Sequence, residues 1–495
     1  MADRVCPHPA EDAFVWQSQG GPWRRAMRPL SIAVVALALS ACTVGPDYVR
    51  PAQDVGAAYA HAPAPEGSWV PADTPPRALP TDWWTLFGDA VLDDLMRRMP
   101  PGNLDLAQAE AQFRQARASL DSARAGLFPT LGVSSSVSRA GQGVSQAGNP
   151  STTYGLSATA SWEVDLWGRV RRDVESARAG EQASAADLDA MRLSLQSTLA
   201  QAYFGVRASQ LQDALLARTL DEYARALEMT RNRLAAGVAS PADVAAASVQ
   251  LDQARAQRIR LGWQREQQIH AISVLLGQVP AGFRLTQGAT LPKVPDVPAG
   301  VPSTLLLRRP DVAGAERRAA QANARIGVAQ AAWFPDLTLS AQGGYRAMEF
   351  TSWIMTPARF WTLGPALALS LFDGGARAAA VASARAAYDA QAAAYRKTVL
   401  DALREVEDAL VQSQALVQEQ AARDRALAAA RETLRQVTNQ YQAGLVDYLS
   451  VVQAQTSALS AEQTALDVRA QRLTASAQLI AALGGGYVVG DYAVN

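Results

Sequence analysis

The sequence predicts an α+β membrane protein in which one unit of long helices and short strands is used twice. Four landmarks recur in order at offsets of 206 or 207 residues, namely Phe128-Pro129, Gly168, Gly237 and Gly277, then Phe334-Pro335, Gly375, Gly444 and Gly484. Apolar and small polar residues also alternate over several short segments, and one stretch of 68 residues lacks both Gly and Pro. A duplication so nearly free of gaps indicates that these spacings are structural lengths.

Composition excludes some classes of function. The chain has 495 residues, 46 basic and 46 acidic side chains, three His and two Cys. Balanced charge gives no reason to expect nucleic acid as a partner, because phosphate binding needs an excess of clustered Lys and Arg. Both cysteines, Cys6 and Cys42, lie in the first tenth of the chain, so we expect no disulfide scaffold.

Residues 1–41 are predicted to be a signal peptide. Three arginines precede the apolar run Leu30 to Ala41, which would span only about 18 Å as a helix against about 30 Å of bilayer hydrocarbon. The segment is therefore typical of a targeting sequence and not of a transmembrane anchor. Met27 is an alternative start, which would place residues 1–26 outside the protein.

Leu39-Ser40-Ala41-Cys42 resembles a bacterial lipobox, in which the Cys thiol receives a diacylglycerol. We therefore expect a covalent lipid on Cys42 and no other cofactor. Thr43 in place of Asp after this cysteine favours sorting to the outer membrane. The alternative is an ordinary signal peptide that is cleaved near a cysteine.

The mature chain is divided by its repeat. Residues 42–80 are rich in Pro and Ala and are predicted to form an extended, lipidated segment. The first repeat is expected over 81–300 and the second over 301–484, followed by a C-terminal tail at 485–495.

Each repeat is predicted to open with a helix and continue as a strand pair. The first opening helix runs from about Asn103 to Leu127 and the second over 311–333, each ending before a Phe-Pro pair. Alternation of apolar and polar residues predicts four strands, at about 130–139, 154–166, 336–346 and 361–373. Pro365 lies inside the last of these and suits only an edge or a bulge.

One face of these strands is apolar and the other is small and polar. This pattern is typical of a transmembrane β-barrel with a wet lumen, and equally of a soluble sheet half buried on a core. The lipidated N-terminus and the lack of a core-sized globular region favour the membrane. Because closed transmembrane barrels start at eight strands, four strands per chain predict an oligomer.

A long helix and a closing helix complete each repeat. The sequence predicts long helices over 169–236 and 376–443, each about 100 Å in length, and closing helices over 241–276 and 445–483. Apolar residues at spacings of three, four and seven along the second long helix indicate a coiled-coil seam. An opening and a closing helix stacked end to end would match one long helix.

Five motifs recur in a known arrangement. They are Asn103-Leu104-Asp105-Leu106, Trp162-Glu163-Val164-Asp165-Leu166-Trp167-Gly168-Arg169, Arg308-Arg309-Pro310-Asp311-Val312, Gly364-Pro365 and Leu371-Phe372-Asp373-Gly374-Gly375. Together they resemble the signature segments of the TolC-like outer-membrane efflux channels, specifically the OprM/NodT lipoprotein branch that serves RND efflux systems. The resemblance implies a homotrimer with a shared 12-stranded barrel, four strands per chain, that continues into a long periplasmic α-helical barrel. It also implies the outer membrane of a Gram-negative bacterium, a periplasmic membrane-fusion adaptor and an inner-membrane RND pump.

The resemblance further assigns roles to the turns between long and closing helices, which lie at the helix ends furthest from the strands. As periplasmic tips they would contact the adaptor through Arg233, Gly237, Ser240, Tyr441 and Gly444. The structural alternative is that these glycines only permit the left-handed conformation that ends a helix.

By the same resemblance the periplasmic constriction falls on Leu449, Gln453 and Thr456. Related channels often carry Asp at the Gln453 position, and OprM-like ones carry Arg at the Thr456 position. Both charges are missing here, so this chain departs from the pattern of a salt-bridge lock between subunits. We expect a hydrogen-bonded or apolar throat closed mainly by Leu449. Asp447 is expected either to ring the entrance or to act as a helix N-terminal residue.

No catalytic constellation is visible, and the chain is predicted not to be an enzyme. His270 has no Cys or second His near it, and Gly484-Gly485-Gly486 follows a helix and not a strand, which argues against a phosphate loop. The leading hypothesis is a passive exit duct that conducts small molecules from periplasm to exterior. The alternatives are a type I protein secretion channel and a lipid-anchored coiled-coil scaffold.

Replacement of Cys42 by alanine tests the lipobox. We expect Cys42→Ala to abolish lipid attachment, because the thiol is the acceptor. One acyl chain contributes about 0.8 kcal/mol per buried methylene, whereas a closed barrel holds the membrane by itself, so partial function should survive. Metabolic labelling with a radioactive fatty acid measures the attachment, and label that persists in the variant would contradict the assignment.

Overall fold

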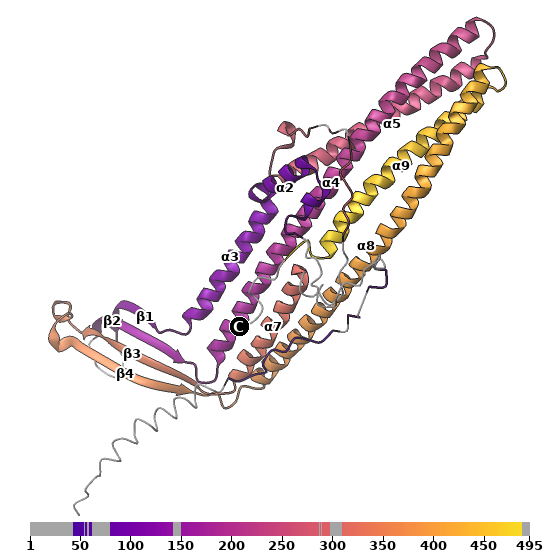
Figure 1. Cartoon of the computed structure of the whole chain (residues 1–495). Coiled ribbons are helices and arrows are strands. Elements are labelled where there is room, and N and C mark those ends of the chain that lie inside the picture. Colours follow the sequence, from indigo (N-terminus) through magenta and orange to yellow (C-terminus); the bar gives the residue numbers. More distant parts are fainter. Residues whose placement is uncertain are drawn as a thin grey trace, which may run out of the picture. The chain divides into compact units, whose positions relative to one another are not determined.

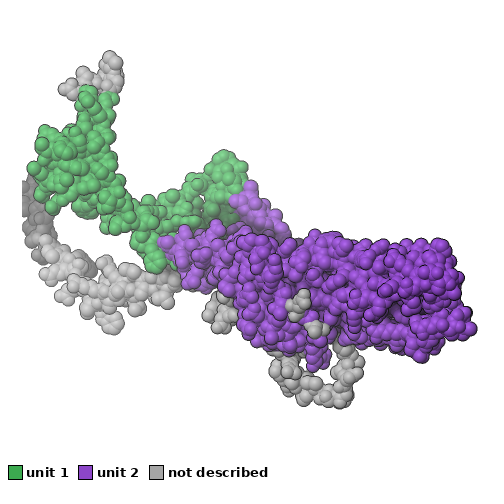
Figure 2. Space-filling model, turned by 90° about the horizontal axis from the view of Figure 1, so that it is seen from above, with its two compact units in different colours: residues 1–45, 126–172, 327–377 green, residues 46–125, 173–326, 378–495 purple. Residues whose placement is uncertain are grey.

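The computed structural model describes residues 43–53, 55–56, 59–61, 80–141, 150–286, 288, 290–297 and 309–487 (Figure 1). The chain separates into two compact units (Figure 2). One contains residues 126–172 and 327–377 with the N-terminal residues up to Gly45, and the other contains residues 46–125, 173–326 and 378–495. Each unit draws on both sequence repeats. Cys42 and the signal region lie outside the described residues.

The first unit contains one four-stranded antiparallel sheet in the order β1-β2-β3-β4. The strands are β1 (Thr130–Ala140), β2 (Ser151–Val164), β3 (Asp336–Ala347) and β4 (Arg359–Ala368). The register is continuous, so directly opposed residues share a face. β1 and β4 are the two edges of the sheet.

The register collects the apolar residues on one face of the sheet. Its rows include Val137 with Tyr154 and Ala347, Leu131 with Ala160, Ala341 and Leu363, and Val164 with Leu337 and Leu367. This surface, the apolar face, is strongly exposed, with Leu131 78% and Leu363 72% accessible.

The opposite surface, the polar face, carries small hydroxyl and amide side chains. Rows there join Ser134 with Ser157, and Gly132 with Thr159, Gln342 and Thr362. The hydroxyls of Ser134 and Ser157 lie 3.1 Å apart, and the Gln342 amide donates to Ser157 at 3.3 Å. The period-two pattern in the sequence therefore corresponds to two chemically distinct faces.

The last strand ends earlier than expected. The sequence predicts a strand over 361–373, but β4 covers Arg359–Ala368. The strand ends where its partner does, because Ala368 pairs with Asp336, the first residue of β3. Beyond the strand, the Asp373 carboxylate accepts from the backbone of Gly375 and Arg377 and forms an ion pair with Arg377, at the start of the next helix.

The second unit consists of helices that pack along one another. They are α2 (Ala90–Gly102), α3 (Leu104–Ala125), α4 (Arg169–Ala235), α5 (Pro241–Leu275), α7 (Pro310–Ala331), α8 (Ala376–Gln442) and α9 (Tyr448–Ala482), and some of them begin or end in the first unit. Short 3₁₀ turns lie at Trp83–Phe87, Pro280–Gly282, Phe350–Ser352 and Thr356–Ala358. Among the described residues no helix combines the length and the hydropathy needed to cross a membrane.

Helix α2 is missing from the sequence prediction, which starts the opening helix at Asn103. Pro100 and Pro101 suggest a break, yet they occupy the last turn of α2. Asn103 separates the two helices: its side-chain oxygen accepts from the backbone of Leu106 at 2.9 Å, and its amide donates to the carbonyl of Leu275 at 2.9 Å. Asn103 therefore caps α3 and ties it to the end of α5.

The main core of this unit combines the 3₁₀ turn at Trp83–Phe87, α2 and the middle of α4. Trp83, Phe87, Tyr203 and Phe204 are fully buried, and the rings of Phe87 and Phe204 lie 4.9 Å apart. Apolar residues from α5, α7, α8 and α9 complete the cluster. A second, smaller cluster around Tyr223 and Tyr448 lies near the turns that end the long helices.

The landmark Gly277 permits a close backbone approach. Its φ is +66°, and a Cβ atom there would lie 2.0 Å from the carbonyl oxygen of Gly102. A Cβ on Gly102 would in turn lie 2.3 Å from the carbonyl of Leu276. The ends of α2 and α5 can therefore meet only through glycine backbone.

Substitution of Gly277 should destabilise the helical unit more than substitution of a turn glycine. Both Gly277→Ala and Gly237→Ala place alanine at positive φ, which costs about 1–2 kcal/mol. Gly237 has no atom within 4 Å of an added Cβ, whereas Gly277 meets the Gly102 backbone. We expect a larger fall in the apparent Tm for Gly277→Ala, measured by circular dichroism in detergent. Equal falls for the two variants would contradict this account.

Candidate functional site

The first predicted tip is the turn between α4 and α5. Gly237 has φ +74° and follows the last turn of α4. Ser240 and Asp243 form a capping box at the start of α5: the Ser240 hydroxyl accepts from the Asp243 backbone at 3.2 Å, and the Asp243 carboxylate accepts from the Ser240 backbone at 2.8 Å. The Ser240 side chain thus satisfies a free N–H at the helix start.

The second predicted tip is the turn between α8 and α9. Gly444 has φ +77°, and Asp447 caps α9 by accepting from the Ser450 backbone at 3.0 Å and from its hydroxyl at 2.7 Å. These hydrogen bonds from Ser450 lower the pKa of Asp447. Its carboxylate therefore fulfils the helix N-terminal role, one of the two that the sequence left open.

The two turns contact each other through aromatic side chains. The Arg233 guanidinium lies 4.6 Å from the ring centroid of Tyr441, and the Tyr441 and Tyr448 rings are 5.5 Å apart. Arg233 belongs to α4 and Tyr441 to α8, so this contact joins the two repeats. The sequence singled out both residues as adaptor contacts but gave no signal that they pair with one another.

The predicted constriction residues share one face of α9. Leu449, Gln453 and Thr456 are all exposed in the single chain, and Leu449 is 53% accessible. Their spacings of four and three place them on one side of the helix, while Tyr448, Val451 and Val452 are buried on the other. In the described chain this face combines one apolar and two uncharged polar side chains.

Thr456 connects this face with the other closing helix. Its hydroxyl donates to the Val452 carbonyl at 2.9 Å and lies 3.3 Å from the side-chain oxygen of Gln250 on α5. Gln250 and Thr456 are 206 residues apart, whereas the glycines that flank them in the two repeats are 207 apart, so the contact joins positions one residue out of register. The two closing helices therefore meet at nearly equivalent points.

The residues that follow Cys42 are held in the first unit. The Val44 backbone donates to the carbonyl of Trp167 at 3.0 Å, and Arg172 donates to the carbonyls of Val44 and Gly45, both at 3.3 Å. Gly45 has φ +108°, and a Cβ there would lie 2.5 Å from the Cα of Gly327. The chain next to the predicted lipid site is therefore fixed by backbone bonds and glycine packing.

The Arg-Arg-Pro-Asp motif has a structural role at Arg309, whereas Arg308 lies outside the described residues. Arg309 donates to Glu405 at 2.7 Å, to the carbonyl of Ala482 at 3.2 Å and to Asp311 at 2.6 Å. Burial acts to lower the pKa of Arg309, but the bonds to Asp311 and Glu405 raise it overall. This side chain connects the start of α7 and the end of α9 with the middle of α8.

The described part of the chain holds no group of three or more His, Cys, Asp or Glu side chains arranged for a metal ion. His270 lies exposed on α5, where its backbone carbonyl accepts from Ser273 at 2.7 Å. Gly484, Gly485 and Gly486 all have positive φ and end α9. None of these positions brings together a nucleophile and a base.

Comparisons with known proteins agree on one family. The sequence model described as "Outer membrane efflux protein" matches residues 100–278 and 301–485. The chain is 33% identical over 465 residues to the outer membrane protein OprJ of Pseudomonas aeruginosa, covering 92% of this chain and 96% of the relative. It is 31% identical over 465 residues to the probable efflux pump outer membrane protein TtgC of Pseudomonas putida, covering 92% of this chain and 95% of that relative.

A solved structure gives the same result. The outer-membrane channel OprN matches with a TM-score of 0.83 and 31% sequence identity, over 90% of this chain and 99% of that chain. The likeness therefore extends over nearly the whole polypeptide and includes both the sheet and the helices.

Loss of the Arg309 charge should destabilise the helical unit. Arg309→Met removes three polar contacts and leaves Asp311 and Glu405 without their partner, which we expect to cost about 1–2 kcal/mol because both carboxylates are partly exposed. Arg404→Met on α8 is the control, since Arg404 forms an exposed pair with Asp408. Thermal unfolding in detergent should show a clear fall in Tm for Arg309→Met alone, and matching falls would refute the bridging role.

Proposed function

The chain belongs to the outer membrane efflux protein family, and we propose that it is the exit channel of a tripartite RND-type efflux system. It is an outer membrane protein, as its relatives are. In this proposal it conducts small molecules passively from the periplasm to the exterior. A periplasmic membrane-fusion adaptor and an inner-membrane pump open it and supply the energy.

The observation that carries this proposal is the division of the sheet into two faces. The apolar face exposes large side chains on the edge strands, such as Leu131 and Leu363, and the polar face carries hydroxyls and amides. A barrel wall in a membrane requires this division, with lipid outside and water inside. A sheet that packs on a soluble core would instead bury its apolar rows. Leu131 and Leu363 belong to these rows and are exposed in the described chain.

The edges of the sheet support a wall built from several copies. β1 and β4 each have one paired side within the chain. In hydrocarbon an unpaired backbone group costs several kcal/mol, so a membrane sheet must close on itself. Since four strands are too few to close, we propose a homotrimer with a 12-stranded barrel, in which β4 of one copy pairs with β1 of the next.

Exposed apolar side chains on the helices support the same assembly. Ile259 and Trp263 on α5 are 73% and 50% accessible, and Leu400 and Val411 on α8 are 60% and 42% accessible. Apolar side chains at spacings of four along a helix commonly pack against another helix. We propose that neighbouring copies cover them in a helical barrel.

The remaining assignments follow from the family and belong to the proposal. Cys42 carries the lipid that anchors the chain, and the turns around Gly237 and Gly444 contact the adaptor. Leu449, Gln453 and Thr456 line the periplasmic constriction, which lacks charged side chains. Arg233 and Tyr441 hold the two turns together until the adaptor separates them.

Conductance of the purified full-length protein in planar lipid bilayers tests the proposal. We expect discrete conductance steps of uniform size, together with a mass of three copies in detergent. The same preparation after heat dissociation is the control and should be silent, because single copies cannot close the sheet. A native preparation that leaves the bilayer inert, or that is a single copy, would refute the channel.

The kind of molecule transported distinguishes this proposal from the alternative of a type I secretion channel. Deletion of the gene should make small amphipathic compounds accumulate in the cell and leave secreted proteins unchanged. Loss of a secreted protein with unchanged compound accumulation would favour the alternative.

A further inference from the structure

The connection between β3 and β4 is unusually apolar for an exposed loop. Residues 348–358 contain one charged side chain, Glu349, and several large apolar ones. Met348 is 72% accessible, Phe350 64%, Ile354 56% and Met355 57%. An exposed apolar group of this kind marks a surface that binds a partner or a membrane. The β1–β2 connection at 141–150, by comparison, has no aromatic residue in its sequence.

The loop lies on the apolar side of the sheet. The ring of Tyr154 on β2 is 5.4 Å from that of Phe350 and 6.4 Å from that of Trp353, and the last two rings stack at 6.0 Å. The register places Tyr154 in a row with Val137 and Ala347, on the apolar face. The aromatic cluster therefore continues the surface that faces lipid in the proposed barrel.

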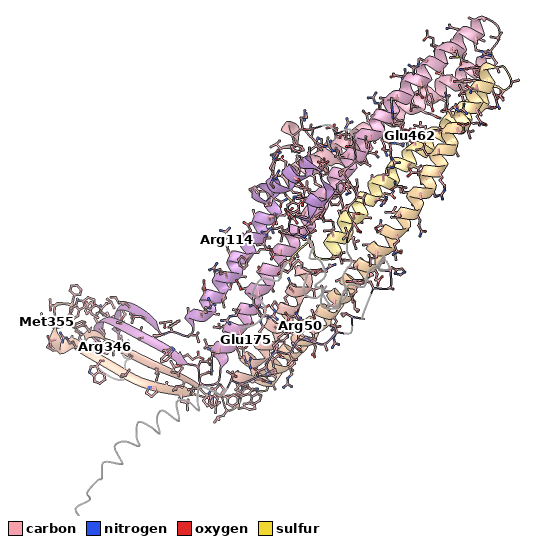
Figure 3. All side chains as sticks on the ribbon, in the orientation of Figure 1. Arg50, Arg114, Glu175, Arg346, Met355 and Glu462 are labelled. Atoms are coloured by element: carbon pink, nitrogen blue, oxygen red, sulfur yellow. The ribbon has the colours of Figure 1, made fainter. Side chains whose placement is uncertain are left out.

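At this end of the sheet the polar face carries a charged side chain. Arg346 precedes the end of β3 and belongs to the polar rows, and its guanidinium lies 4.8 Å from the ring of Phe360. Figure 3 labels Arg346 on its strand and Met355 in the loop beyond it. The loop thus separates a charged residue on the lumen side from an aromatic cluster on the lipid side.

The depth of the cluster follows from the strand length. The rows from Val164 to Tyr154 extend about 33 Å along the strand, and a strand tilt of about 40° reduces this to about 25 Å across the membrane. That equals the height of the apolar band in transmembrane barrels. Phe350 and Trp353, which pack on Tyr154, then lie at the boundary between acyl chains and headgroups, where aromatic side chains are enriched.

We propose that the β3–β4 loop is a membrane anchor that inserts Phe350, Trp353, Ile354 and Met355 into the lipid at the headgroup boundary. This inference rests on the proposed function, because it needs the apolar face to contact lipid. The occupant is lipid, since the cluster is continuous with the lipid-facing rows and the loop holds one charge, Glu349, while Arg346 and Arg359 lie in the flanking strands, where their charges can reach the headgroups. A loop that closed the pore would instead pack over the polar face.

Labelled cysteine variants test the insertion. The wild-type chain has no cysteine after Cys42, so Ile354→Cys and Met355→Cys can each carry one bimane fluorophore, with labelled wild type as background. The probe is a phosphatidylcholine vesicle with brominated acyl chains, which quench fluorophores in contact with lipid. We expect at least twofold quenching at either loop position, and stronger quenching by bromines near the headgroup than by deep ones.

Two matched positions make the outcome decisive. Leu363→Cys lies in the middle of the apolar face and should be quenched more by deep bromines, and Val238→Cys at a helix turn should not be quenched. Quenching at Leu363 without quenching at Ile354 and Met355 would overturn the anchor, and would favour a loop in water or over the pore. Absence of quenching at Leu363 as well would overturn the barrel, and the anchor with it.

Discussion

The strongest constraint on this molecule is that a sheet in hydrocarbon must satisfy every backbone hydrogen-bonding group. The register of the four strands is continuous and pairs each inner strand on both sides, but among the described residues it leaves one side of β1 and one side of β4 without a ladder. Side-chain chemistry then decides the surroundings, because the two faces differ too sharply for a single solvent. Both features are satisfied by the proposed barrel, in which copies of the chain lie beside each other with lipid on one face and water on the other.

The helical unit solves a different problem, which is to keep long helices packed without a globular core. Its largest core is local, around Trp83, Phe87 and Phe204. Elsewhere, stability depends on capping and on close backbone contact, as at Asn103 and at the Gly102–Gly277 approach. The landmark glycines are therefore needed for different physical reasons. Gly237 and Gly444 end helices where an added Cβ would have no atom within 4 Å, whereas a Cβ on Gly277 would meet the backbone of Gly102.

Much of this architecture could be predicted because its signals are periodic. Apolar and polar residues alternate along residues 154–164, and Gly and Pro are absent from residues 376–443. Many residues carry each of these signals, so a single exception does not hide it. The errors have local causes: β4 ends at Ala368 because its partner strand β3 begins at Asp336, and Pro100 and Pro101 are tolerated at the end of α2. The Arg233–Tyr441 contact could not be foreseen, since residues 208 positions apart in sequence meet through tertiary packing alone.

The contact between Gln250 and Thr456 has a consequence for how the two sequence repeats can differ. The position that corresponds to Gln250 in the second repeat is Ser457, and the position that corresponds to Thr456 in the first is Val249. Because the contact joins non-equivalent positions, a substitution on one side does not demand the same substitution in the other repeat. The closing helices can therefore evolve independently at this contact, a freedom that identical subunits related by exact symmetry do not have.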